Sequence, residues 1–153
     1  MATVYSTQRT NSRATPVVMN KANELGGRVR VAHGVYEASS LASGDVIEMF
    51  TLPDGARLLE GSLAHDALGS STTLSVGHAA YKNADGTAVS AAAAAYKADA
   101  ASTSAQKVDI IATLALGSGT ELDADEDGVI VTATMGGAAG TGTIEVTIKY
   151  VVD

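Results

Sequence analysis

The stretch Ile144-Glu-Val-Thr-Ile-Lys-Tyr150 alternates apolar and polar side chains without a break. This period of two places Ile144, Val146, Ile148 and Tyr150 on one face of a β-strand and Glu145, Thr147 and Lys149 on the other. The same period occurs upstream at Val129, Val131, Ala133 and Met135, and again at Val108, Ile110, Ala112, Leu114 and Leu116. The last third of the chain therefore predicts three strands with one buried face each, separated by glycine turns at Gly117-Ser-Gly119 and Gly136–Gly142.

Four more strands are predicted toward the N-terminus, over Arg28–Val35, Val46–Leu52, Ala56–Leu63 and Ser71–Gly77. In the first, the residues Val29, Val31 and Val35 share one face, and Arg28, Arg30 and Ala32 share the other. In the second, both faces are apolar, which is typical of a strand buried on both sides or lying at a subunit contact. In the fourth, Leu74 and Val76 point inward.

Short turn sequences separate these strands. They are Gly44-Asp45, Pro53-Asp54-Gly55 and Asn83-Ala-Asp-Gly86. Proline presets φ for the second position of a turn, and glycine accepts the positive φ that other positions require. Gly55 is therefore predicted to have a positive φ and to fix the angle between two core strands.

One segment predicts a helix. Five consecutive alanines occupy Ala91–Ala95, and alanine has the highest intrinsic helix propensity. We expect a short helix over about Val89–Ala101, with Ser90 as its N-cap. It would be marginal alone and would need to dock on the sheet or on a neighbour.

These elements predict an all-β fold, an antiparallel β-sandwich or jelly-roll-like domain over residues 28–153 with one short Ala-rich helix. Residues 1–27 differ from the rest because they are polar, lack periodicity, and contain Pro16 and Gly26-Gly27. We expect an extended N-terminal arm, with a short strand or turn around Val17–Leu25, that becomes ordered against another chain. A frayed terminus is the alternative.

Composition excludes several classes of protein. The chain of 153 residues has 17 acidic and 10 basic residues, a net charge of −7 and no cysteine. Phosphate backbones repel such a surface, so no direct nucleic-acid binding is expected. No apolar stretch is long enough to span a bilayer, so no membrane partner is expected. The lack of cysteine fits assembly in a reducing host cytoplasm.

The three histidines, His33, His65 and His78, suggest no reaction centre. The chain has no Gly-x-Ser-x-Gly motif, and the neighbours His65 and Asp66 would point to opposite faces of a strand. Their spacing does not predict the three converging ligands of a zinc site. We therefore interpret them as surface or hydrogen-bonded structural residues, and we expect a protein that is not an enzyme.

Two loops resemble ligand-binding motifs only in part. Asp123-Ala-Asp-Glu-Asp-Gly128 begins like a calcium loop, but Thr134 stands where the bidentate glutamate belongs, so an acidic β-turn is favoured. Gly136–Gly142 lacks the Lys-Ser/Thr of a phosphate-binding loop, so we interpret it as a flexible hairpin connection. The sequence thus nominates no catalytic, cofactor-binding or metal-binding residue, although weak cation binding at Asp123–Asp127 stays open.

One long block carries a resemblance to a known family. Gly44–Gly77 contains Gly44-Asp45 followed by apolar residues, then Leu52-Pro-Asp-Gly-Ala56, Asp66-Ala-Leu-Gly69 and Ser71-Thr-Thr-Leu-Ser-Val-Gly77. This pattern resembles the decoration or cement proteins of tailed double-stranded DNA bacteriophages, and Gly142–Tyr150 is similar to their last strand. The resemblance touches about Arg28–Val152. Its motifs are turns and strand faces, so it transfers no catalytic residue.

The resemblance implies a virion structural protein that binds the outer surface of the major capsid protein shell and stabilises it. It also implies self-association, as a dimer or trimer. Multivalent binding to a symmetric shell needs only small contacts, and strand edges or arms can supply them. Another virion subunit, from a tail, neck or fibre base, is the first alternative. A carbohydrate-binding β-sandwich is the second, although the chain has no tryptophan for sugar stacking.

Overall fold

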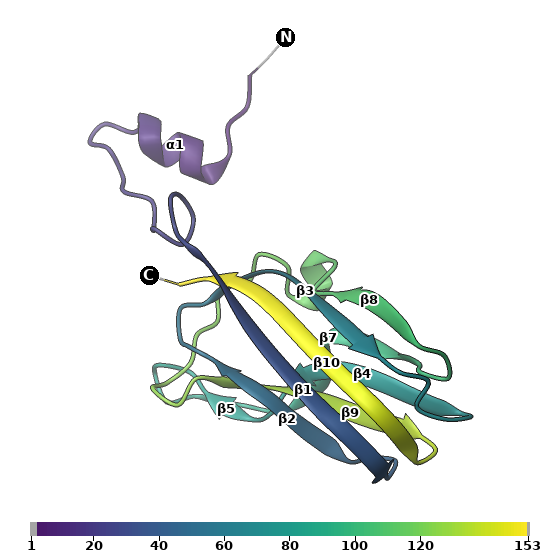
Figure 1. Ribbon diagram of the computed structural model, residues 1–153. Helices are drawn as coiled ribbons and strands as arrows, with labels where there is room; N and C mark the ends of the chain where they lie inside the picture. The colour runs from purple at the N-terminus through teal and green to yellow at the C-terminus, as the bar shows by residue number, and fades with distance from the viewer. Residues whose placement is uncertain (1–2, 153) are drawn as a thin grey trace.

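The computed structural model describes residues 3–152 and consists of two antiparallel four-stranded sheets that face each other as a sandwich (Figure 1). The elements are α1 (Thr7–Arg13), β1 (Val29–Leu41), β2 (Val46–Leu52), β3 (Arg57–His65), β4 (Thr72–His78), β5 (Tyr81–Lys82), β6 (Ala88–Val89), β7 (Ala92–Ala101), β8 (Gln106–Ile110), the short 3-10 helix η1 (Leu114–Leu116), β9 (Val129–Gly137) and β10 (Gly140–Val151). The prediction of an all-β antiparallel sandwich is confirmed.

The strand order shows how the chain crosses between the layers. The first sheet has the order β1-β10-β3-β8, and the second has the order β2-β9-β4-β7, while β5 and β6 form a separate ribbon. Apart from the step from β4 through the ribbon to β7, each strand is followed by a strand of the opposite sheet. Pairing within a sheet is therefore mostly between strands far apart in the sequence.

The core lies between the inner faces of the two sheets. The first sheet contributes Ala38, Leu58, Leu63, Ile110, Ile144, Val146 and Ile148, and the second contributes Ile47, Leu52, Leu74, Val76, Tyr96, Val129, Val131, Ala133 and Met135, all of them buried. The alternation predicted for β9 and β10 is thus confirmed, because the predicted inward residues Val129, Val131, Ala133 and Met135 of β9 and Ile144, Val146 and Ile148 of β10 are buried. Aliphatic side chains supply most of the filling, as expected for a thin sandwich core.

The glycine-rich stretch Gly136–Gly142 is not a hairpin. β9 ends at Gly137 in the second sheet, and β10 begins at Gly140 in the first sheet. Gly137 has a φ of +72°, which allows the chain to turn sharply from one layer to the other. The predicted hairpin connection is therefore wrong, and the segment is a corner between sheets.

The strand predicted through Leu116 ends earlier. β8 stops at Ile110, and Ile111 has a φ of +58°, outside the range of a strand. η1 follows, with Thr113 as its N-cap, and the Leu114 side chain is 86% exposed. The alternation of apolar residues beyond Ile110 was therefore not a strand signal.

The predicted Ala-rich helix is a strand. Ala92–Ala101 forms β7, an edge strand paired with β4. Between the pairs His78↔Ala92 and Val76↔Lys97 the register shifts, so β7 bulges over Gly77. A Cβ atom at Gly77 would overlap the carbonyl oxygen of Ala92. Pairing with β4 and the free space above Gly77 outweigh the helix propensity of alanine, which is at most about 1 kcal/mol per residue relative to other residues.

Burial of Val46–Leu52 on both sides is also a wrong prediction for the single chain. β2 is an edge strand on which Ile47 and Leu52 are buried and Val46 is exposed. The register shifts between Glu48 and Phe50, which inserts Met49 as a β-bulge. The bulge explains why apolar residues follow each other on both faces. The alternative of a subunit contact stays a prediction.

The turn Pro53-Asp54-Gly55 is confirmed, and it supports a testable prediction. Gly55 has a φ of +71°, and the amide of Ala56 donates to the carbonyl of Pro53 at 3.3 Å. We expect Gly55→Val to lower the free energy of unfolding by more than about 1 kcal/mol, because a β-branched side chain is strained at positive φ. Urea denaturation of the purified protein measures this, with Gly55→Ala as the milder control. Equal stability of Gly55→Val and the original protein would contradict the assigned turn.

Within residues 3–152, no helix is long and apolar enough to cross a lipid bilayer.

Candidate interaction surface

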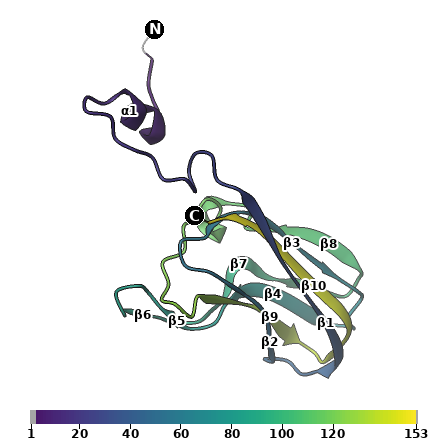
Figure 2. The same ribbon diagram turned by 60° about the vertical axis from the view of Figure 1, so that its left-hand side comes forward.

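The N-terminal arm, defined here as residues 3–27, projects from one end of the sandwich (Figures 1 and 2). It is not extended as predicted, because Thr7–Arg13 forms the helix α1. The Ser6 hydroxyl caps this helix by accepting a hydrogen bond from the Arg9 amide at 3.3 Å. No residue of α1 is buried, so the helix has no apolar core of its own.

The arm holds its own shape through Asn20. The Asn20 amide nitrogen donates to the carbonyl of Gln8 at 3.1 Å, and its side-chain oxygen accepts from the Asn11 amide group at 3.0 Å. These bonds fold the segment after α1 back along the helix. The strand or turn expected over Val17–Leu25 is a turn at residues 22–26.

The base of the arm is fixed to the sandwich by charge. The Arg57 guanidinium on β3 lies 2.7 Å from Glu121 and 3.7 Å from Glu24, and Lys21 lies 2.7 Å from Glu121. Asn23 is buried and donates to the carbonyl of Gly55 at 3.2 Å. Residues 21–24 are therefore part of the folded body, whereas the rest of the arm stands clear of it.

The same ion pairs shift the pKa values of two residues at the base of the arm. The hydrogen bond from Lys21 holds the pKa of Glu121 below its usual range, and the Glu121 carboxylate raises the pKa of Lys21. Because the pKa of Glu121 is lowered in the folded protein, its contribution is present above the ordinary glutamate pKa and is lost as the pH falls through the lowered value. The ion pair that fixes the base of the arm is thus formed at neutral pH.

The free part of the arm presents apolar side chains to solvent. We call Val17, Val18 and Met19 the arm patch; their exposed fractions are 62%, 50% and 85%. Leu25 is also exposed and lines a shallow hollow beside them. Exposed apolar residues that cluster in this way mark interaction sites.

A second apolar surface runs along β1. Val29, Val31 and Val35 face solvent with exposed fractions of 59%, 59% and 54%, while Ala32 and Ala38 of the same strand face the core. We call these three residues the valine stripe. The predicted shared face is confirmed, but it is the outer face of the first sheet. The sequence could not show this, because the residues of β1 that face the core are small, namely Ala32, Gly34 and Ala38.

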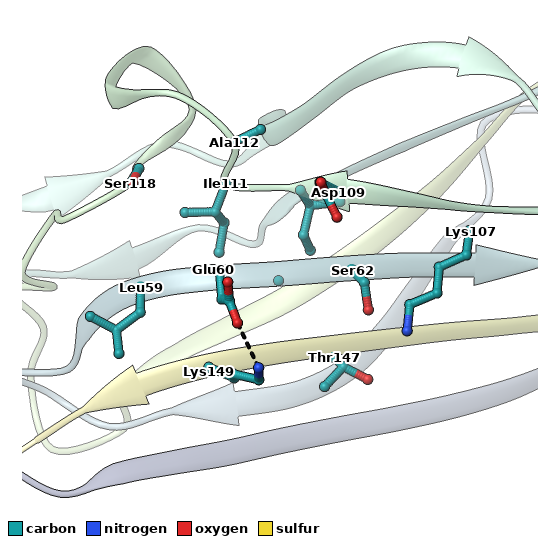
Figure 3. Close-up of a pocket in the computed structure, with 12 residues that line it drawn as sticks. Leu59, Glu60, Ser62, Lys107, Asp109, Ile111, Ala112, Ser118, Thr147 and Lys149 are labelled. Carbon is teal, nitrogen blue, oxygen red and sulfur yellow. Dashed lines mark hydrogen bonds and ion pairs between the residues drawn. The ribbon is translucent and has the colours of Figure 1, made fainter.

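Beside the valine stripe, the outer face of the first sheet carries a groove of about 490 Å³ over β3, β8 and β10 (Figure 3). Glu60 and Lys149 form an ion pair across neighbouring strands, and the hydrogen bond from Lys149 lowers the pKa of Glu60. Lys107 and Asp109 line the opposite side. The groove is shallow and of mixed charge, which suits contact with a protein surface.

The three histidines occupy separate places. His33 lies on the outer face of β1, with Nδ1 2.8 Å from the hydroxyl of Thr147. His65 is buried, with Nδ1 2.7 Å from the carbonyl of Asp66. His78 has Nδ1 2.9 Å from the carbonyl of Ala79 and packs edge-on against Tyr81. Each is a surface or hydrogen-bonded structural residue, as interpreted from the sequence.

The acidic loop is a β-turn, as favoured by the sequence. The Gly128 amide donates to the carbonyl of Asp125 at 3.0 Å, and Asp125 accepts from the Asp127 amide at 3.1 Å. Asp123 accepts from the backbone amide of Ala84 at 3.1 Å, so it ties this loop to the β5–β6 turn. Among residues 3–152, no three His, Cys, Asp or Glu side chains are grouped as metal ligands would be.

The arm patch and the valine stripe are the functional candidates that sequence reasoning missed. A signal existed for the first, since Val17-Val18-Met19 is the only run of three apolar residues within residues 1–27. No signal existed for the second, because an alternating strand does not reveal which of its faces is covered.

Comparison with known proteins gives the fold a context. No family model matches the chain, and no curated protein matches it. Among solved structures, a chain of the cyanophage Pam1 capsid asymmetric unit aligns with a TM-score of 0.64 and 20% identity over 100% of both chains. A chain of the capsid of Ralstonia phage GP4 aligns with a TM-score of 0.62 and 24% identity, over 83% of this chain and 86% of that one. The protein therefore shares its β-sandwich fold with chains of two phage capsids.

Proposed function

We propose that the protein is a decoration protein of a tailed bacteriophage, which binds the outer surface of the major capsid protein shell and stabilises it. The observation that carries this proposal is the end-to-end structural likeness to a chain of the Pam1 capsid asymmetric unit. Because the alignment covers all of both chains, it includes the N-terminal arm as well as the sandwich. The role is structural, without a reaction.

The nature of the matched structure favours decoration over a tail, neck or fibre-base subunit. An asymmetric unit is the element that symmetry repeats over a whole shell, so each of its chains occurs in many copies. A tail or neck protein occurs at a single vertex. A protein present in many copies can bind through small contacts, because their effect sums over the particle.

The charge of the chain supports the outer surface. Its net charge is −7, and a surface of this sign that faced packaged DNA would be repelled by the phosphates. On the outside the same charge keeps the free protein soluble before it binds. The outer face of the first sheet and the projecting arm offer two surfaces for such contacts.

The copy number in virions tests the proposal. Quantitative mass spectrometry of purified virions of the encoding phage should give parity with the major capsid protein, or a simple fraction of it. A count of about six or twelve copies per particle, as for a ring at one vertex, would contradict decoration and favour a tail or neck subunit.

A second measurement separates decoration from shell formation. Particles stripped of the protein should keep their symmetry in electron micrographs but rupture at a lower temperature and on milder osmotic shock. Adding back the purified protein should restore the original rupture temperature. Disassembly of the shell itself on removal would show that the chain is a shell-forming subunit and would overturn the proposal.

A further inference from the structure

Two apolar surfaces on the same chain lack a partner. The arm patch projects from the body, and the valine stripe lies on the outer face of β1. The arm cannot cover its own stripe in this conformation, because its base is fixed by Arg57, Glu121 and Asn23 and its free part points away from the sandwich (Figures 1 and 2). Both surfaces are therefore open to another molecule.

The distribution of charge along the chain indicates which molecule covers the two apolar surfaces. Residues 1–27 carry three basic and one acidic side chain, whereas residues 28–153 carry seven basic and sixteen acidic side chains. The arm is thus positive and the body strongly negative. Oppositely charged surfaces attract each other, and this attraction directs one partner onto the other.

Two of the acidic side chains of the body lie beside the valine stripe. On the outer face of the first sheet, Val35 pairs with Glu145 of β10, and Glu37 follows it on the same face of β1. Both carboxylates are exposed. In the free part of the arm, α1 carries Arg9 and Arg13, and Arg13 lies four residues before the arm patch. Lys21, which follows the patch, is already paired with Glu121. Along the stripe, Val31 pairs with Lys149, whose charge is met by Glu60, so the unpaired charge beside the stripe is acidic and lies at the Val35 end. This end matches the apolar arm patch and its basic neighbours on α1.

We propose that the protein self-associates by arm docking: the arm patch of one copy packs on the valine stripe of a second copy, with the arm's basic residues next to Glu37 and Glu145. A second copy is favoured over a different partner because this one chain supplies both halves of a contact that agree in polarity and in charge. The inference goes beyond the decoration role, since it concerns the isolated protein and requires no particle.

Light scattering coupled to gel filtration tests the docking. The purified protein should show a mass that rises with concentration to at least twice that of the monomer. Two changes should each raise the dissociation constant by about tenfold or more: Val31→Lys, and separately the triple change Val17→Ser, Val18→Ser and Met19→Ser. Each of them places polar groups in an apolar contact. Leu114→Lys is the control, since Leu114 is 86% exposed, more than Val31, but lies on η1, and this variant should associate like the original.

Mixing the variants separates arm docking from other modes of association. The Val31→Lys protein retains an arm patch, and the triple variant retains a valine stripe, so a mixture of the two should form a complex that neither forms alone. Raising the salt concentration should weaken every complex, since it screens the attraction between arm and body. A mixture that stays monomeric would overturn the proposal, as would an original protein that is monomeric at all concentrations.

Cross-linking gives a readout that does not depend on affinity. The chain has no cysteine, so Met19→Cys and Val31→Cys proteins mixed under oxidising conditions can form only the engineered disulfides. We expect the mixed Met19–Val31 dimer to dominate, whereas Met19→Cys with Leu114→Cys should give only background. Equal yields in the two mixtures would overturn the docking of these two surfaces. Particle binding is measured separately, so failure here leaves the decoration role intact.

Discussion

Replacing Gly77 with alanine is expected to lower the free energy of unfolding by about 3 kcal/mol or more, a loss at the upper end for overpacking. The added Cβ atom would overlap the carbonyl oxygen of Ala92 and lie 2.8 Å from that of Ala93. Both are backbone atoms of β7, so no side-chain rotation can relieve the clash. β7 would have to move away from β4, which breaks the pairing between the two strands.

Gly86→Ala is the matched control for this experiment. Gly86 has a φ of +85° and nothing within 4 Å of the position of a Cβ atom. The same substitution there should cost only about 1 kcal/mol, through backbone strain without a clash. Urea denaturation followed by circular dichroism gives both values. Similar losses for the two variants would show that β7 does not bulge over Gly77.

The second large effect is expected from Leu58, which is completely buried on β3. Leu58→Ala should lower the free energy of unfolding by about 2–5 kcal/mol, because it removes buried methyl groups and leaves a cavity between the sheets. The neighbouring Leu59 points to the opposite face and is 37% exposed. Leu59→Ala should therefore cost clearly less than Leu58→Ala.

Thermal and urea unfolding of the pair test which face of β3 is covered. The two variants carry the same chemical change at adjacent positions, so helix or strand propensity cancels in the comparison. A larger loss for Leu59→Ala would mean that the strand is turned over and that the sheet packs through its other face.

The sequence predicted the strands where burial and alternation agree. Val129–Gly137 and Gly140–Val151 alternate because every second residue contacts the opposite sheet. The turns at Gly55 and Gly86 were predicted because both residues have a positive φ that glycine accepts at little cost. These features depend on residues that are close together in the sequence, so they can be predicted from it.

The sequence-based predictions were wrong where contacts between residues far apart in the sequence determine the local structure. β7 is a strand because Gly77, far away in the sequence, leaves space for its backbone. The β9–β10 segment is a corner because β10 pairs with β1 and β3 in the other sheet. The arm patch and the valine stripe were missed for the same reason, since exposure depends on what the remaining chain covers. None of these relations is visible within a window of ten residues.

The pairing of β1 with β10 also bears on how the protein is made. β10 is the last strand of the chain, yet it lies between β1 and β3 and is the only hydrogen-bonded partner of β1 among residues 3–152. On the ribosome, β1 emerges before β10 and stays unpaired until residues 140–151 have been translated. Such long-range pairing makes folding slow compared with that of helical proteins. The outer face that carries the valine stripe therefore forms only after β10 has been synthesised.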